Sequence, residues 1–517
     1  MSFSKVVVFL SLGLSTLAQN WPQASGPNGD YQVEGQAPIE WSAVRNENIK
    51  WRTPMPEAGQ AAVTVWGDKL FTTVHKPIES EDQKGQVKDI IALCLDAESG
   101  KILWQKEMPG AIAIDLANGF SDGTVFSPLC DGEKVWFFNR CGQMACFDLD
   151  GNEIWKRDFV PRYMHANRQA EPSFVGDTIL YVEIAEKKKE FINGVRKDSK
   201  VKNKYANDKG FWTYIHGLDK NTGEVLWREE NGTVIHCNPM VGKRENGAQA
   251  LLQVRGGGHA PVETPYGFNL MSLESGKEGQ VIWQKPLKGI MTSANLCWNE
   301  KYVPLFVGAE HQIYHTESGE LFKKIDLLND VQVHKKGQAS EQVTIKGKKG
   351  KALTYFTNIL VGDAHYFLSH SAPYLGKVNM ETGKLEYLEL PGQLIPGKNS
   401  ASEDIYIHEL KKIKNDPVNQ NNLHVGNKGH NGSGFGHISS ASPILVGKHL
   451  IIPVVTGTVY VIDTTKPFKN GEALVAVNDL GEAGKTWTLS SFSYSEGKLY
   501  AHTMKELICI KGKDNEN

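Results

Sequence analysis

Short apolar runs separated by glycine-containing turns recur along the chain. Each run ends on an acidic or polar residue, a Ser-Gly, Thr-Gly or Asp-Gly pair follows, and a second run carries a bulky residue. The clearest copies are IALCLDAESGKILW at 91–104, MACFDLDGNEIW at 144–155 and YIHGLDKNTGEVLW at 214–227. Glycine supplies the positive φ that a tight hairpin needs. The pattern therefore predicts an antiparallel hairpin in each copy.

Weaker copies follow at 271–283, 314–322, 378–387 and 459–474. A second hairpin pattern precedes each copy, as in AVTVWGDKLF at 62–71, where Gly-Asp separates two apolar runs. Such hairpins lie near residues 61–74, 125–138, 171–184, 236–254, 294–307, 357–370, 441–455 and 490–501. Two hairpins in succession give four short antiparallel strands, which is the pattern of one propeller blade.

The bulky position in the second run of each copy also occurs eight times. It is filled by Trp51, Trp104, Trp155, Trp227, Trp283, Phe322, Tyr387 and Leu474. The Trp51 segment, 48–53, has no hairpin before it, and the hairpin at 490–501 has no partner after it. We therefore predict an all-β, eight-bladed propeller in which the N-terminal strand completes the last blade, so that no sheet edge stays open. Seven blades is the alternative, because the fifth and sixth copies are degraded.

We interpret these tryptophans as structural blade residues that pack between blades. The propeller is expected to span residues 19–511, with insertions at about 186–210 and 393–437 and a polar tail at 512–517. Neither insertion shows the apolar periodicity of a separate core.

The first 18 residues have the pattern of a secretory signal peptide. Lys5 precedes an apolar run from Val6 to Leu14, and Ala18 offers a small residue at the cleavage position. We expect cleavage after Ala18 and a soluble protein that is secreted or periplasmic. An uncleaved anchor is the alternative. The first cysteine is Cys94, which argues against a lipid anchor at the mature N-terminus.

Charge and cysteine usage narrow the classes of function. The chain has 57 Lys and Arg against 59 Asp and Glu, and this balance excludes a globally basic nucleic-acid binder. No two of the 7 cysteines have the spacing of a zinc cluster, so we predict no metal site. Cys94, Cys146 and Cys509 occupy matching strand positions and are expected to be buried. Cys130 and Cys141 flank one hairpin, and a disulfide between them is an open alternative.

The phrase Leu-Asp-x-x-Ser/Thr-Gly-x-x-x-Trp resembles the repeat of quinoprotein-like β-propellers. That group contains the alcohol dehydrogenases that use pyrroloquinoline quinone (PQQ) and the outer-membrane assembly propeller BamB. The opening WPQASGPNG at 21–29 is similar to the start of secreted PQQ-like repeat proteins of planctomycete-type bacteria. The resemblance implies either a scaffold protein or an oxidoreductase that holds PQQ with calcium. The dehydrogenases carry two adjacent cysteines beside the cofactor, and this chain has no adjacent pair.

In a propeller, the loops that lead into the innermost strands meet on one face around the central channel. The chemically reactive residues of these loops are our candidates for a channel-face binding site. They are Asp122, His165, Arg168, Glu171, His236, Asn238 and His437. Together they could bind an anion or a metal, or perform acid–base chemistry. The alternative is that they cap hairpins and hydrogen-bond neighbouring blades.

The sequence therefore favours a secreted binding or scaffold protein. Its channel-face loops would take a protein, glycan or small-molecule ligand, and no nucleic acid or transmembrane segment is expected. The alternative is a PQQ-dependent oxidoreductase of the alcohol or sugar dehydrogenase type. We predict no cofactor for the first hypothesis, and PQQ with calcium for the second.

Overall fold

The computed structural model describes fourteen parts of the chain. They are residues 19–77, 86–115, 123–161, 171–186, 191–192, 195–196, 211–230, 238–255, 267–290, 295–346, 357–369, 373–409, 418 and 441–512. Within these ranges, no helix has the length and apolar character needed to cross a membrane.

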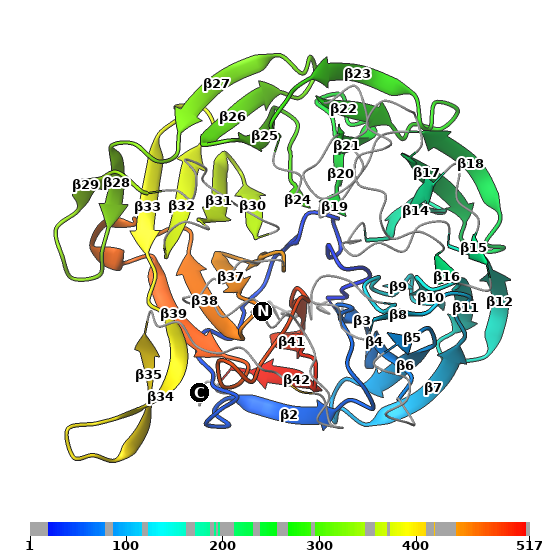
Figure 1. The fold of residues 1–517 in the computed structure, drawn as a ribbon, viewed down its shortest axis with the longest axis horizontal. Helices are drawn as coiled ribbons and strands as arrows, with labels where there is room; N and C mark the ends of the chain where they lie inside the picture. The colour runs from blue at the N-terminus through cyan, green and yellow to red at the C-terminus, as the bar shows by residue number, and fades with distance from the viewer. Residues whose placement is uncertain are drawn as a thin grey trace, which may run out of the picture.

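Eight sheets stand around one axis like the blades of a propeller (Figure 1). Strands in the first four blades, from the axis outward, are β3 (Thr64–Trp66), β4 (Lys69–His75), β6 (Ile90–Asp96) and β7 (Ile102–Met108); β9 (Leu129–Cys130), β10 (Lys134–Asn139), β11 (Gln143–Asp148) and β12 (Glu153–Asp158); β13 (Ser173–Val175), β14 (Thr178–Glu186), β17 (Phe211–Asp219) and β18 (Val225–Glu230); β20 (Val241–Lys243), β21 (Gln249–Arg255), β22 (Gly267–Ser272) and β23 (Val281–Pro286).

Strands in the other four blades follow the same order. They are β25 (Tyr302–Val307), β26 (Glu310–His315) and β27 (Leu321–Asp326); β30 (Asn358–Val361), β31 (Ala364–Leu368), β32 (Tyr374–Asn379) and β33 (Leu385–Glu389); β36 (Ile444–Val446), β37 (His449–Pro453), β38 (Thr458–Asp463) and β39 (Leu474–Asp479); β40 (Ser493–Ser495), β41 (Lys498–His502), β42 (Glu506–Lys511) and β2 (Ile49–Pro54). Blade 5 is preceded by β24 (Asn295–Leu296), which pairs in parallel with β19 (Asn238–Pro239) in a separate two-stranded sheet. The prediction of eight blades is confirmed, and seven is excluded.

Ring closure follows the predicted route. Strand β2, near the start of the chain, pairs antiparallel with β42, and Trp51 lies opposite Cys509. The Arg52 guanidinium Nε donates to Glu506 Oε2 at 2.9 Å across the same pair. The N-terminal strand thus becomes the outer strand of blade 8, and the last sheet has no missing partner.

Four of the five predicted tryptophans form hydrogen bonds at the seams between blades. Their indole N–H groups donate to a backbone carbonyl of the next blade: Trp51 to Ala97, Trp104 to Leu149, Trp155 to Lys220 and Trp283 to Thr316, at 2.8–3.1 Å. The fifth, Trp227, packs against an apolar cluster that contains Leu251 and Met271 of blade 4. The rings of the first four lie against turn glycines of the next blade, namely Gly100, Gly151, Gly223 and Gly319, all with positive φ. At Gly100, a Cβ atom would meet the Trp51 ring at 2.5 Å. The repeated Trp of one blade and the repeated turn Gly of the next blade therefore form the same contact at each of these seams.

Cysteines behave as packing residues. Cys94, Cys146 and Cys509 are fully buried and lie opposite Trp104, Trp155 and Trp51 in their sheets. Cys130 and Cys141 form no disulfide with each other, so that alternative is wrong. Cys130 pairs with Val135 at the start of β10, whereas Cys141 follows the far end of that strand. Six residues along the strand therefore separate the two cysteines by about 20 Å, whereas the Cα atoms of a disulfide lie within roughly 7 Å of each other.

Residues 19–48 cross the inside of the ring before the chain reaches β2 (Figure 1). They bond to innermost strands at the end where β3 turns into β4 and β36 into β37, which we name the hairpin face. Asn20 Oδ1 accepts from the Gly67 amide in the first of these turns, and the Val33 carbonyl accepts from the Gly447 amide in the second. This segment is named the N-terminal strap.

The strap reaches the innermost part of six blades. Its backbone and side-chain partners are Val65 in blade 1, Cys130 in blade 2, Phe174 in blade 3, Leu360 in blade 6, Leu445 in blade 7 and Tyr494 in blade 8, at 2.8–3.2 Å. Within it, β1 (Gln32–Val33) pairs in parallel with β36 on the channel side, as a fifth strand of blade 7. Ser42 and Val44 then bond the buried Asp479 carboxylate at the outer edge of blade 7.

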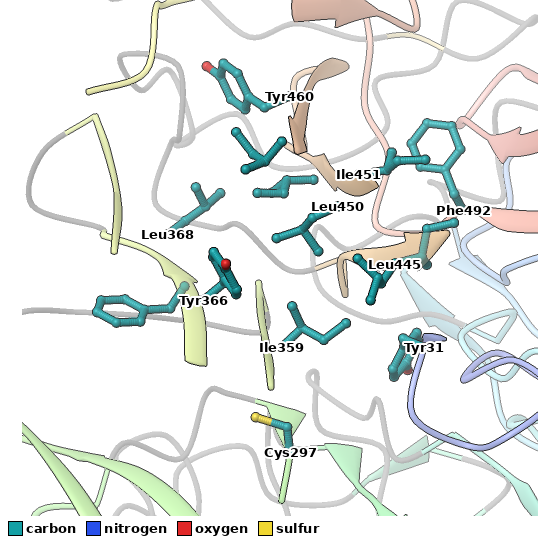
Figure 2. Close-up of a cluster of buried hydrophobic side chains, with 14 of the residues drawn as sticks. Tyr31, Cys297, Ile359, Tyr366, Leu368, Leu445, Leu450, Ile451, Tyr460 and Phe492 are labelled. Carbon is teal, nitrogen blue, oxygen red and sulfur yellow. The ribbon is translucent and has the colours of Figure 1, made fainter. Parts of the chain in front are cut away.

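Apolar side chains of the strap belong to the main core. Trp21 and Tyr31 are buried at 0% and 4% exposure. Figure 2 shows Tyr31 in one cluster with Ile359, Leu445 and Phe492, which come from blades 6, 7 and 8. The strap is therefore an integral part of the ring and contributes to its core.

Two hairpins depart from the simple blade plan. Strands β28 (Val331–His334) and β29 (Glu341–Val343) add to the outer edge of blade 6, where β28 pairs in parallel with β33. Strands β34 (Gln393–Lys398) and β35 (Asp404–Glu409) form a hairpin that projects from the ring in Figure 1. The remaining short elements are β5 (Gln86–Val87) with β8 (Ile114–Asp115), β15 (Phe191–Ile192) with β16 (Val195–Arg196), β19 (Asn238–Pro239) beside β24, and the 3₁₀ turn η2 (Lys469–Gly471).

Candidate functional site

The face opposite the hairpin face receives the connections from each outer strand to the next innermost strand. We name it the connection face. All seven predicted site residues belong to these connections in the chain order. Five of them, Asp122, His165, Arg168, His236 and His437, lie outside the described residues. Asn238 is placed by its backbone in β19, which pairs in parallel with β24, and its side chain is not described.

Glu171 is the one predicted residue whose side chain the structure describes. It precedes β13, and its carboxylate accepts from the Ser127 amide at 2.8 Å and from the Ser127 hydroxyl at 3.2 Å. Burial raises the pKa of Glu171 to about 7, and the two bonds from Ser127 oppose this rise without cancelling it. The carboxyl group thus joins blade 3 to blade 2 and can exchange a proton near neutral pH.

Further polar contacts continue from Glu171 toward blades 1 and 8. Ser127 Oγ accepts from the Ala62 amide at 2.9 Å, and Thr124 Oγ1 accepts from the Gln60 amide at 2.9 Å. Ser490 of blade 8 donates its hydroxyl to the Gln60 carbonyl at 2.9 Å. We name the connected residues Gln60, Thr124, Ser127, Glu171, Ser490 and His502 the polar arc.

His502 closes the arc at the end of β41. Its Nδ1 lies 2.8 Å from the Ala61 carbonyl and 3.2 Å from Thr72 Oγ1, so the ring is held between blades 8 and 1. The arc therefore spans four blades that are adjacent in the ring but come from both ends of the chain.

Gln60 is the member of the arc with unused bonding capacity. Its side chain is 5% exposed, and neither Oε1 nor Nε2 has a hydrogen-bond partner among the described residues. A buried amide without partners is destabilising by about 1–3 kcal/mol, so it marks a place where a ligand could supply the bonds. Gln60 was not among the site residues predicted from the sequence. The signal that could have found it is its place just before the innermost strand of blade 1.

The arc offers a neutral amide, hydroxyl groups and one carboxyl group of raised pKa. This set suits hydrogen bonding to hydroxyl or amide groups of a ligand, and Glu171 adds a proton donor or acceptor. Among the described residues, no group of three or more His, Cys, Asp and Glu is placed to hold a metal ion. The six described cysteines are buried, and no two cysteines of the chain are adjacent in sequence.

The fold is an eight-bladed β-propeller. Residues 41–188 match the family model described as outer membrane protein assembly factor BamB, which covers the first blades. No curated protein matches the chain in sequence.

Solved structures with similar folds come from both branches of the resemblance. A europium-containing methanol dehydrogenase is 11% identical, with 93% of this chain and 89% of that chain covered and a TM-score of 0.48. The quinohemoprotein alcohol dehydrogenase of Comamonas testosteroni is 9% identical, with 96% and 82% covered and a TM-score of 0.48. BamB from Moraxella catarrhalis is 12% identical, with 90% and 99% covered and a TM-score of 0.33.

Proposed function

We propose that this chain is a binding or scaffold propeller that works outside the cytoplasm and takes its ligand at the connection face. The observation that carries the proposal is the N-terminal strap. Because the strap bonds to innermost strands at the hairpin face, the chain itself occupies that mouth of the channel. The polar arc lies at the other mouth.

The chemistry of the arc narrows the kind of ligand. Gln60 supplies a donor and an acceptor in a buried position, and the other members supply hydroxyl groups and the Glu171 carboxyl group. A neutral ligand rich in hydroxyl or amide groups matches this set, since it can satisfy both atoms of the glutamine amide. A sugar or an exposed peptide loop of a protein partner has this character.

The test measures binding of neutral mono- and disaccharides and of an acetylated, amidated Asn-Gly peptide to the full mature chain by calorimetry. Gln60→Leu removes the amide of the arc and is expected to weaken binding at least tenfold. Gln253→Leu is the matched control, because Gln253 is equally buried in blade 4 and its amide atoms also lack partners among the described residues. Equal effects of the two substitutions would contradict a site at the polar arc.

The alternative function, a quinone-dependent oxidoreductase, predicts a different result with the same purified protein. PQQ and calcium added to the pure protein would then give a stoichiometric bound chromophore and reduction of a dye with an alcohol or sugar. That result would replace the binding proposal. Absence of the chromophore, together with loss of sugar or peptide binding in Gln60→Leu, would support it.

A further inference from the structure

Blades 5 and 6, which are neighbours in the ring (Figure 1), meet through two buried histidines. His311 on β26 and His365 on β31 are 0% and 1% exposed, and His311 Nε2 lies 2.8 Å from His365 Nδ1. Phe306 and Phe367 pack against both imidazole rings, with ring centroids 5.5–6.1 Å apart. We name His311 and His365 the histidine pair, and the contact between the two blades seam 5–6.

Hydrogen bonds fix which ring nitrogens carry protons. His365 Nε2 lies 3.0 Å from Asn358 Oδ1, and because an amide oxygen can only accept, Nε2 is the donor. In a neutral ring His365 Nδ1 is then an acceptor, so His311 Nε2 donates to it. This leaves His311 Nδ1 without a proton, and it has no hydrogen-bond partner on another described residue. The bonds of the pair are thus those of two neutral rings.

A further proton is disfavoured on either ring. On His311 Nδ1 it would create a buried charge, and on His365 Nδ1 it would also remove the acceptor of the bond between the rings. Burial lowers the pKa of His311 to about 3, which a bond to its own backbone opposes only in part. Burial, and next the charge of His311, lower the pKa of His365 well below its ordinary value.

One further titratable group touches the pair among the described residues. The Cys297 thiol donates to Asn358 Oδ1 at 3.1 Å and lies 3.3 Å from His365 Nε2. Burial raises the pKa of Cys297 to about 12, so it stays a neutral thiol. It therefore supplies no negative charge that would stabilise an imidazolium.

Strand alternation identifies the other titratable or charged side chains that face seam 5–6 from the paired strands of both blades. They are Tyr302, His315, Lys323, Tyr374, Tyr387 and Glu389. The Lys323 ammonium lies over the Phe322 ring, and the Glu389 carboxylate lies 3.6 Å from Lys335 Nζ. None of the six is among the causes of the two histidine pKa shifts. The only carboxylate of this set is thus directed to a lysine.

Seam 5–6 also lacks the contact that recurs elsewhere in the ring. At the seams that follow blades 1, 2, 4 and 8, a tryptophan ring covers the turn glycine of the next blade. At seam 5–6, Lys323 lies against the turn glycine Gly383, with its Cδ 3.2 Å from the position of a Cβ atom there. The sheet of blade 5 has three strands, because β24 pairs with β19 instead. The histidine pair and its two phenylalanines therefore carry more of this seam than side chains at the same depth do elsewhere.

We infer that seam 5–6 is an acid-sensitive joint: in mild acid, proton uptake by His311 and His365 separates blades 5 and 6 locally while the other blades stay packed. The sign follows from linkage, since rings that reach water regain a pKa near 6.5 and bind protons below it, whereas the buried rings stay neutral. Each exposed ring favours the open seam about 30-fold at pH 5 relative to pH 7.5. Opening would expose the rings of Phe306 and Phe367.

The test measures hydrogen–deuterium exchange of the full chain at pH 7.5 and pH 5.0, corrected for the intrinsic exchange rate at each pH. Exchange in β26 and β31 is expected to rise at least tenfold at pH 5.0. Strands β10 and β11 of blade 2 contain no histidine and should change less than about twofold. Equal rises in both blades, or no rise in β26 and β31, would overturn the inference.

His311→Phe keeps an aromatic ring but removes one titrating group. It is expected to reduce the acid-induced rise in β26 and β31 at least fivefold, because one fewer proton is taken up on opening. His315→Phe is the matched control on the same strand, and because His315 is exposed it should leave the rise unchanged. The same rise in His311→Phe as in the wild type would contradict the joint.

A measurement on the wild type keeps the test valid if His311→Phe does not fold. With histidine labelled by ¹⁵N, the ring signals of His311 and His365 should show the neutral form with the proton on Nε2 at pH 6, while both strands are still protected. An imidazolium signal from either ring in the protected state would show that the closed seam accepts the proton, and it would overturn the inference.

Discussion

The two mouths of the channel are built in opposite ways. At the hairpin face, the N-terminal strap packs buried aromatic side chains against the ring and forms backbone hydrogen bonds with its innermost strands. At the connection face, the polar arc leaves the amide of Gln60 without a partner among the described residues and holds Glu171 at a raised pKa. The hairpin face thus contributes to stability, and the connection face keeps groups that can form hydrogen bonds with a ligand. Substitutions on the hairpin face should therefore lower the free energy of unfolding, whereas substitutions on the connection face should raise it or change its dependence on pH.

Trp21→Ala should give the largest loss of stability. Trp21 is fully buried, and its backbone exchanges two hydrogen bonds with Val65 at 2.8 and 2.9 Å. Truncating a buried tryptophan lowers the free energy of unfolding by about 3–5 kcal/mol because a cavity remains. Urea denaturation followed by circular dichroism measures the change. A loss below about 1 kcal/mol would show that the strap is not part of the core.

Asp479→Ala tests where the strap leaves the ring. The buried carboxylate accepts from Ser42 Oγ at 2.6 Å and from the Val44 amide at 2.9 Å. Its removal leaves both donors without an acceptor and is expected to lower the free energy of unfolding by about 2–3 kcal/mol. Ser42→Ala, which removes only one donor, should lower it by about 1 kcal/mol. Equal losses in both variants would show that Asp479 does not organise this contact.

Glu171→Gln probes the connection face through pH. The pKa of Glu171 is about 7 in the folded chain and near 4.5 in the unfolded chain, so the folded state binds more protons between these values. The wild type should therefore lose stability as pH rises from about 4.5 to above 7. The glutamine variant should lack this loss and be more stable by about 2 kcal/mol at pH 8, where partial solvent contact of the carboxyl group reduces the full effect of its shift. Denaturation curves at pH 5 and pH 8 give the comparison, and parallel curves would contradict the raised pKa.

Gln60→Leu should have the smallest effect on stability, with the sign reversed. Its amide forms no hydrogen bond with described residues, so an apolar replacement of similar size removes a burial penalty. We expect the free energy of unfolding to rise by about 1 kcal/mol, measured in urea beside Trp21→Ala. A loss of 2 kcal/mol or more would mean that the amide is already satisfied within the folded chain.

Local patterns explain why so much of the ring could be predicted. A turn glycine and an outer-strand tryptophan recur because each pair makes the same contact with the next blade, as Trp155 does with Gly223. The closing role of Trp51 followed from simple counting, since one strand lacked a hairpin before it and one hairpin lacked a strand after it. These features depend on residues that are neighbours in sequence or repeat at regular intervals.

The strap could not be predicted, because its contacts join residues that are far apart and have no repeating pattern. Trp41 and its partner Asn478 are separated by 437 positions. The buried network between blades 5 and 6 was missed for the same reason. There His311 Nε2 lies 2.8 Å from His365 Nδ1, and Cys297 Sγ lies 3.1 Å from Asn358 Oδ1. Only the packing of two blades brings these side chains together.

Of the predicted site, only Glu171 has a described side chain, and the other six residues stay predictions.

The strap also fixes the order in which the ring can be completed. Residues 21–48 are synthesised before every blade of the ring, yet they also dock on strands β36, β39 and β40 of the last two blades. Contacts of such long sequence separation form slowly, because the intervening chain must be ordered before they are made. A translation product that stops before β36 would have no site on blades 7 and 8 for its own beginning, and its apolar Tyr31 would remain uncovered. A chaperone or protease that recognises exposed aromatic side chains would therefore bind the uncovered strap of a truncated chain and not the buried strap of a complete ring.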